Sequence, residues 1–236
     1  MNIAAILAGG CGKRTGQDVP KQFLNVNEKP IIIYTLEVFE KHPNIDTIIV
    51  ACLEGWDEIL SAYAREFNIT KLRGVVTGGR NVQESIGNIM SKLKDGCKSD
   101  DIVLIHDAIR PMVSQEIISD CIATCKEKGS GLAAVRCQET IVRTEDGMKG
   151  DKGIDRSEVM RVQTPQAYLF GKALWAVEEA ERRDIKEEVY MNTLMIGLGE
   201  TVYFSAGSNK NIKITTTEDV DIFNALHKTK REEWVK

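Results

Sequence analysis

The sequence predicts an α/β fold in which helices cover a doubly wound, mostly parallel, Rossmann-like sheet. Through the first 136 residues, short apolar runs alternate with segments whose apolar residues recur at helical spacing. The first run is apolar throughout, which is typical of a strand buried on both faces of a parallel sheet. Glycines and charged residues follow three of the runs, at the sheet edge where such folds bind their ligands.

These first 136 residues supply the strands and helices in alternation. Strands are expected at 3–7, 47–52, 72–77, 101–105 and 131–136. Helices are expected at 29–42, 57–67, 82–93 and 114–128. Pro30 near the start of the first helix and Ser114 at the start of the last are residues that favour helix N-termini.

Residues 138–163 break this alternation. A strand at 140–144 leads into an Asp-Gly pair that favours a tight turn, and 159–163 could return as its partner. We expect this hairpin to project from the core as an arm that embraces a second subunit. The elements expected beyond it are a helix at 165–183, strands at 201–205 and 211–215, and a C-terminal helix capped by Thr217.

Composition restricts the class of protein. The chain, 1–236, is expected to form one domain, and its hydrophobic content of 42% is enough for a sizeable core. A net charge of −4 makes nucleic acid and anionic membrane unexpected partners. We see no apolar run of transmembrane length, no signal peptide and no C-x-x-C pair among the cysteines. We therefore expect a cytoplasmic protein with reduced thiols.

A glycine-rich turn directly follows the first strand, and two cations come after it. Glycine lets the backbone approach a ligand closely, and the successive N–H groups of such a turn suit a phosphate. The spacing fits neither the P-loop nor the dinucleotide-binding fingerprint. An ordinary βα turn is the alternative, but the cations favour a polyphosphate. The residues are Ala8, Gly9, Gly10 and Gly12 in the turn, with Arg14 and Lys21 after it.

Polar residues at two further strand ends are candidates for the same site. Gly79 and Arg80 follow the third strand, and Asp107 and Arg110 follow the fourth. Asp107 could hold Mg²⁺ or orient a substrate hydroxyl, or it could simply cap a turn. Arg110 could bind an anion or lie on the surface. Lys213 lies in an apolar segment and points either to solvent or into the site.

Several cations stand out in a chain whose net charge is negative. Phosphoryl and nucleotidyl transfer require positioning and neutralisation of charge more than covalent chemistry by the protein. Such cations therefore favour a reaction between two phosphorylated partners. They are Arg14, Lys21, Arg110, Arg156 and Lys213.

Landmarks along nearly the whole chain resemble the family of 2-C-methyl-D-erythritol 4-phosphate cytidylyltransferases and their relatives, the ribitol-5-phosphate cytidylyltransferases. The first is L-A-G-G-C-G-K-R at 7–14, followed by P-K-Q-F at 20–23. The others, in order, are Gly78-Gly79, Ser85, H-D-A-I-R-P at 106–111, Thr140-Ile141, Q-T-P-Q at 163–166 and N-I-K-I-T at 211–215.

The resemblance implies that CTP and a polyol phosphate give a CDP-polyol and pyrophosphate, with Mg²⁺ or another divalent cation. It implies a catalytic role for Arg14, Lys21 and Lys213. It implies CTP binding by Ala8, Gly9, Gly10, Gly12, Gly79, Arg80, Ser85 and Ala108. It implies acceptor binding by Asp107, Arg110, Thr140, Arg156 and Thr164, where Thr140 and Arg156 lie on the arm and complete the site of the other subunit in a homodimer.

Departures from the family pattern concern the acceptor. Arg80 and Val82 stand where methylerythritol enzymes carry an acidic residue and an arginine, while Glu84 resembles the ribitol-type pattern. We favour methylerythritol phosphate, as in isoprenoid precursor synthesis, and keep ribitol 5-phosphate or another alditol phosphate, as in cell-surface polymer synthesis, as the alternative. A sugar-1-phosphate nucleotidyltransferase and a catalytically inactive nucleotide-binding paralogue are the competing hypotheses.

Overall fold

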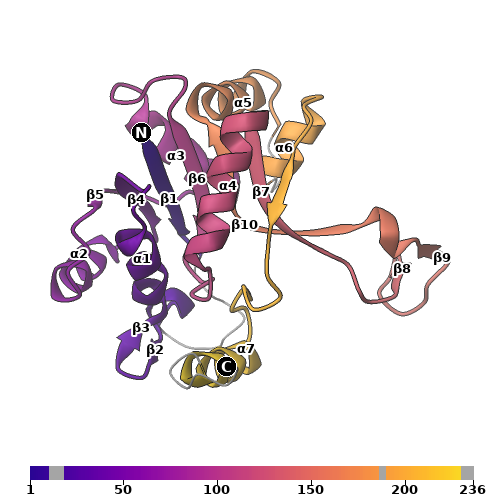
Figure 1. Ribbon diagram of the computed structural model, residues 1–236, viewed down its shortest axis with the longest axis horizontal. Coiled ribbons are helices and arrows are strands. Elements are labelled where there is room, and N and C mark those ends of the chain that lie inside the picture. Colours follow the sequence, from indigo (N-terminus) through magenta and orange to yellow (C-terminus); the bar gives the residue numbers. More distant parts are fainter. Residues whose placement is uncertain (11–18, 186–189, 230–236) are drawn as a thin grey trace.

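One central sheet organises the chain in the computed structural model, which describes residues 1–10, 19–185 and 190–229 (Figure 1). Its strands are β1 (Asn2–Ala8), β4 (Thr47–Cys52), β5 (Leu72–Thr77), β6 (Ile102–Asp107), β7 (Ser130–Arg136), β10 (Met160–Leu169) and β11 (Phe204–Ala206). Their order is β11-β7-β10-β6-β1-β4-β5. Strand β10 runs antiparallel to β6 and β7, and the other neighbouring pairs are parallel. The predicted α/β class with a mostly parallel sheet is confirmed.

Helices cover both faces of this sheet. One face carries α1 (Ile31–Lys41), α2 (Asp57–Glu66) and α4 (Gln115–Lys128), and the other carries α3 (Val82–Leu93), α5 (Phe170–Arg182) and α6 (Met191–Gly197). Within β1, Ala4 and Ile6 face the first layer while Ile3 and Ala5 face the second, and all four are fully buried. This double burial explains why the first run is apolar throughout.

Local sequence signals set several helix ends. The Ser114 hydroxyl accepts a hydrogen bond from the N–H of Ile117 at the start of α4, as predicted, and Gly129 in the left-handed region ends that helix. The last helix, α7 (Thr217–Thr229), is capped by Thr216 rather than by Thr217. The Asp219 carboxylate returns the bond to the Thr216 N–H, which makes a reciprocal capping box.

Helix α7 lies beyond the carboxyl ends of the parallel strands, at the bottom of Figure 1. A small third core joins it to the rest, with Phe223 fully buried against the Tyr34 ring. Ile109, from the turn after β6, and Ile214, from the segment before α7, belong to the same core. The third core therefore ties the C-terminal part of the chain to the edge where the candidate site lies.

The expected helix at 165–183 is wrong over its first residues. Residues 165–169 continue β10, and α5 begins only at Phe170. Tyr168 is fully buried and pairs with Val103 of β6 on one side and Ser130 of β7 on the other. Pro165 is tolerated because the register with β7 shifts between Val162 and Gln166, which frees its position from the ladder.

The predicted hairpin is present within 138–163, and we call it the arm, but its strands pair differently from the prediction. Strand β8 (Ile141–Arg143) pairs with β9 (Lys152–Ile154), and 159–163 belongs mainly to β10 of the central sheet. A 3-10 helix, η3 (Arg156–Glu158), connects β9 to β10. Figure 1 shows this hairpin extending to the right, well away from the sheet.

Further differences concern short elements. The expected strand at 211–215 is irregular chain, and the strand expected at 201–205 is shifted to Phe204–Ala206. The sequence analysis did not predict α6, nor the 3-10 helix η2 (Lys21–Phe23) and the hairpin of β2 (Asn25–Val26) and β3 (Lys29–Pro30). Among the described residues, no helix is both long and apolar enough to span a bilayer.

Candidate active site

A cavity of about 220 Å³ lies where β1, β5 and β6 end. Its walls also include residues from the start of η2, from the first turn of α3 and from the irregular chain before α7. The structure thus joins segments more than 200 residues apart at the sheet edge that the fold class predicts. The predicted site residues that line it are Ala8, Gly9, Gly10, Lys21, Gly79, Arg80, Ser85, Asp107 and Lys213.

Two glycine-containing turns approach each other closely at one wall of this cavity. A Cβ atom on Gly78 would lie 2.8 Å from the Cα of Gly9, and one on Gly79 would lie 2.1 Å from the Cβ of Glu84. Side chains are therefore excluded at both positions. The buried Ser85 hydroxyl accepts a hydrogen bond from the Gly79 N–H (2.9 Å) and donates to the Asn81 carbonyl (2.9 Å). Ser85 thus holds the turn that follows β5.

Gln22 holds the other turn and was missed by the sequence analysis as a separate site residue. Its buried side-chain amide donates to the carbonyls of Ala8 (2.7 Å) and Gly10 (3.0 Å). The neighbouring Phe23 ring stacks on Trp56 at 4.6 Å between centroids. These contacts tie the start of η2, which carries Lys21, to the turn after β1. The P-K-Q-F motif was the available signal, but only the fold shows which carbonyls the amide binds.

A charged network forms the opposite wall. Lys213 Nζ lies 3.0 Å from Asp107 Oδ1, and Arg110 Nε lies 3.0 Å from Asp107 Oδ2. The Thr164 hydroxyl accepts from the backbone N–H of Asp107 at 3.0 Å. Arg110 also donates to the Asn211 carbonyl at 2.7 Å, which fastens the 211–215 segment to this wall. Lys213 therefore points into the site, which resolves the alternative left by its sequence context.

Asp107 remains a carboxylate within this network. Burial by itself would raise its pKa, but the charges of Lys213 and Arg110 outweigh burial and leave the pKa below its ordinary value. The adjacent His106 is fully buried, and burial lowers its pKa to about 3. Neutral His106 has its Nε2 3.3 Å from the Arg110 carbonyl, so it supports the turn rather than adding charge.

The remaining predicted residues lie elsewhere. Ala108 is fully buried, its N–H bonded to Leu7 and its carbonyl to Thr35, so its side chain does not line the cavity. Arg110 and Thr164 contact Asp107 from behind the cavity wall. Thr140 and Arg156 are exposed on the arm. Gly12 and Arg14 lie outside the described residues.

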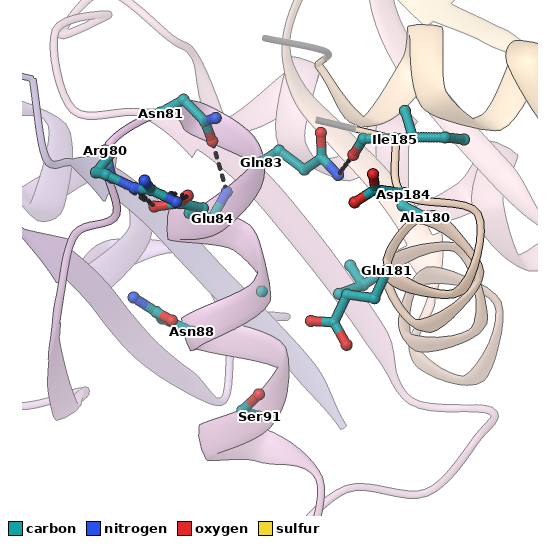
Figure 2. Close-up of a pocket in the computed structure, with 12 residues that line it drawn as sticks. Arg80, Asn81, Gln83, Glu84, Asn88, Ser91, Ala180, Glu181, Asp184 and Ile185 are labelled. Carbon is teal, nitrogen blue, oxygen red and sulfur yellow. Dashed lines mark hydrogen bonds and ion pairs between the residues drawn. The ribbon is translucent and has the colours of Figure 1, made fainter. Parts of the chain in front are cut away.

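A larger cavity, of about 810 Å³, lies between α3 and α5. Figure 2 shows carboxylates on both of its sides, from Glu84 on α3 and from Glu181 and Asp184 near the end of α5. Arg80, at its rim, forms an ion pair with Glu84. Carboxylates repel phosphates, so this groove is a poor site for a polyphosphate and the smaller cavity is the better candidate.

The described residues provide little for a dedicated metal cage. No cluster of three histidine, cysteine or acidic residues is found among them, and Asp107 is the one carboxylate among those that line the smaller cavity. This fits a hard cation such as Mg²⁺ only where phosphate oxygens and water supply most of its ligands. Two phosphorylated substrates would bring such oxygens.

Known proteins match this chain over nearly its full length. The sequence profile of the 2-C-methyl-D-erythritol 4-phosphate cytidylyltransferase family matches residues 2–228. A ribitol-5-phosphate cytidylyltransferase of Lacticaseibacillus paracasei is 47% identical, covering 98% of this chain and 99% of its own. A 2-C-methyl-D-erythritol 4-phosphate cytidylyltransferase of Clostridium botulinum is 36% identical, covering 93% and 94%.

A solved structure supports the same similarity. The crystal structure of the Francisella tularensis 2-C-methyl-D-erythritol 4-phosphate cytidylyltransferase has a TM-score of 0.80 to this chain at 29% identity. The match covers 95% of this chain and 99% of that one. The family match at residues 2–228 includes every described residue that lines the smaller cavity.

Proposed function

Because the chain belongs to the 2-C-methyl-D-erythritol 4-phosphate cytidylyltransferase family, we propose that its own acceptor is D-ribitol 5-phosphate, which it joins to CTP to give CDP-ribitol and pyrophosphate. The chain is an enzyme of the cytidylyltransferase class, so the proposal concerns the acceptor. The observation that carries it is the higher identity to the ribitol-5-phosphate relative than to the methylerythritol relative, each over more than nine-tenths of the chain. We therefore prefer the alternative of the sequence analysis to its first choice.

The reaction follows from the charges around the smaller cavity. A phosphate oxygen of the acceptor attacks the α-phosphorus of CTP, the new P–O bond forms, and the bond to the β-phosphate oxygen breaks to release pyrophosphate. Lys21 and the backbone N–H groups after β1 neutralise charge on the departing side. Lys213, on the opposite wall, neutralises charge between the α-phosphate and the attacking phosphate. Arg14, which lies outside the described residues, would act with Lys21.

We further propose that Mg²⁺ accompanies CTP and is held mainly by its phosphate oxygens. Among the described residues that line the cavity, Asp107 is the carboxylate that could add a ligand. When bound, the ion supplies additional positive charge to the phosphates. Asp107 already accepts from two cations, so its ordinary role in this chain is to hold Lys213 and Arg110 in place.

A homodimer through the arm is the third part of the proposal. Thr140 and Arg156 are exposed on the arm and do not line the cavity of their own chain, which supports a role for them at another copy's site. The arm exposes apolar side chains that a second subunit could cover, among them Val142 and Met148, the latter 87% exposed. The arm's extension away from the sheet also supports this arrangement (Figure 1).

The test is release of pyrophosphate by the purified protein with CTP and Mg²⁺. The acceptors to compare are ribitol 5-phosphate, 2-C-methylerythritol 4-phosphate and glycerol 3-phosphate, and UTP, ATP and GTP replace CTP in parallel assays. We expect the highest kcat/KM with CTP and ribitol 5-phosphate. A preference for methylerythritol phosphate would overturn the proposed acceptor, and a preference for UTP with a sugar 1-phosphate would favour the competing enzyme class. CTP binding without turnover of any acceptor would favour the inactive paralogue.

A further inference from the structure

Lys213 has an aromatic neighbour that no motif predicts. Its Nζ lies 5.3 Å from the centre of the Tyr190 ring, as well as 3.0 Å from Asp107 Oδ1. An ammonium group within about 6 Å of an aromatic ring is attracted by the negative face of that ring. Tyr190 is 44% exposed and does not line the smaller cavity, so it contacts Lys213 from outside the cavity and partly in solvent.

The fold holds Tyr190 in this place. It immediately precedes α6, whose first residue, Met191, is buried in the core. The Asn192 side chain accepts a hydrogen bond from Gln166 Nε2 at 3.2 Å, and Gln166 in turn accepts one from the Tyr168 hydroxyl at 3.0 Å. The start of α6 is therefore fastened to β10, and the backbone that carries the ring is anchored to the central sheet.

Lys213 itself needs such support. It lies in irregular chain rather than in a strand, and the backbone around it is anchored through Ile214, whose N–H donates to the Ile109 carbonyl. The lysine side chain has a flexible four-carbon stem, so an anchored backbone does not fix its ammonium group. A second carboxylate beside Lys213 would hold it but would repel an incoming phosphate. An aromatic ring attracts the ammonium group without adding a negative charge.

We propose that Tyr190 is a positioning residue for Lys213, holding its ammonium group together with Asp107 so that it is ready to meet the reacting phosphates. This inference rests on the proposed function, because Lys213 acts only on bound phosphates. It assigns the role to the ring, not to the hydroxyl. Replacing Tyr190 should therefore change turnover more than the binding of CTP, whose other phosphates lie toward Lys21.

The experiment compares Tyr190→Leu and Tyr190→Phe with the wild-type enzyme, using whichever acceptor the wild type turns over fastest. We expect Tyr190→Leu to lower kcat roughly three- to tenfold, the effect of losing one partly exposed cation–π contact. The KM for CTP should change less than about twofold on the same argument. Tyr190→Phe keeps the ring and should restore most of the lost kcat. The matched control is Tyr203→Leu. Tyr203 is similarly exposed, but it precedes the amino end of β11, whereas the candidate site lies at the carboxyl ends of the parallel strands.

A series of ring-fluorinated phenylalanines at position 190 tests the electrostatic origin, because fluorine weakens the negative face while nearly keeping the ring's size. We expect kcat to fall as fluorine atoms are added. Equal kcat across the series, or a Tyr190→Phe enzyme as slow as Tyr190→Leu, would overturn the role of the ring. An acceptor preference other than ribitol 5-phosphate would overturn the proposed function and leave this comparison valid. A wild-type enzyme that turns over no acceptor would overturn both.

Discussion

Neighbouring residues Lys21 and Gln22 show how differently two side chains serve one site. Both line the cavity, but the Gln22 side chain is buried and donates to two carbonyls of the turn after β1, whereas Lys21 brings a charge. Sequence patterns identified the glycines and the cations as candidate site residues, because the backbone freedom of glycine and the charge of a cation depend little on context. They could not assign Gln22, because the function of a buried amide depends on which backbone groups the fold brings to it.

Replacing Lys21 by alanine should lower kcat by roughly 10²–10³-fold, because it removes a charge that stabilises the transition state of the proposed reaction. The fold should remain intact, since the Lys21 side chain is not among the core residues. The measurement is steady-state pyrophosphate release, with the thermal unfolding midpoint recorded in parallel. Lys128→Ala, on the surface at the end of α4, is the matched control and should behave as wild type. Unchanged turnover in Lys21→Ala would remove Lys21 from the mechanism.

Replacing Gln22 by leucine should damage both stability and CTP use. The carbonyls of Ala8 and Gly10 lose their buried donor, which costs about 1–3 kcal/mol of the free energy of unfolding. The loosened turn should also raise the KM for CTP. The control is Gln83→Leu, which removes a comparable amide-to-carbonyl bond, to Ile185, beside the larger cavity. Urea unfolding and CTP kinetics of the two variants are to be compared. If Gln83→Leu impairs CTP use equally, the effect is not specific to the turn.

At the scale of elements, the sequence predicted those strands and helices whose pattern is local. The helical spacing in α3 and the cap of α4 agree with the structure almost to the residue. Strand β10 was missed in part, because its second half is defined by β6 and β7 on either side and not by any feature of its own sequence. The segment at 211–215 has the composition of a strand, but its backbone bonds only at single points to the wall of the site. Such non-local pairing cannot be read from periodicity.

His42 links two elements and makes stability depend on pH. It ends α1, and its Nε2 lies 3.1 Å from the Gln115 carbonyl at the start of α4, while its Nδ1 accepts from the Asn44 N–H. Burial lowers its pKa below the ordinary 6.5. The unfolded chain therefore binds a proton first as pH falls below about 6.5, so the free energy of unfolding decreases from there down through the folded-state pKa.

The variant His42→Gln keeps an amide donor and acceptor but cannot titrate in this range. We expect it to lower stability somewhat at pH 7 and to flatten the dependence of stability on pH between 7 and 5. Urea unfolding of both proteins at several pH values provides the measurement. Since His106 is buried and titrates in the same direction in both proteins, its contribution cancels in the difference. Parallel pH profiles for the two proteins would show that His42 does not carry the effect.

At the scale of the molecule, the proposed homodimer connects the candidate site to the arm. The sequence indicated a projecting hairpin through its broken alternation and its Asp-Gly turn, and the structure has one. It also places Thr140 and Arg156 on that hairpin, outside the cavity of their own chain. The way in which an arm meets a second subunit is not encoded in any local pattern, because it depends on a surface of the other copy.

Mixing two inactive variants tests whether the arm crosses between subunits. In a heterodimer of Lys21→Ala and Arg156→Ala, crossing arms place both lesions in one site and leave the other site with an intact Lys21 and an intact Arg156. We expect the two homodimers to be nearly inactive and the verified heterodimer to recover about half of the wild-type kcat per dimer, since one of its two equivalent sites is whole. Differently tagged subunits, refolded together and purified through both tags, allow that measurement. If Arg156 instead serves its own chain, each subunit of the heterodimer keeps one lesion in its own site. The purified heterodimer would then stay as inactive as the parents, which would contradict a shared site.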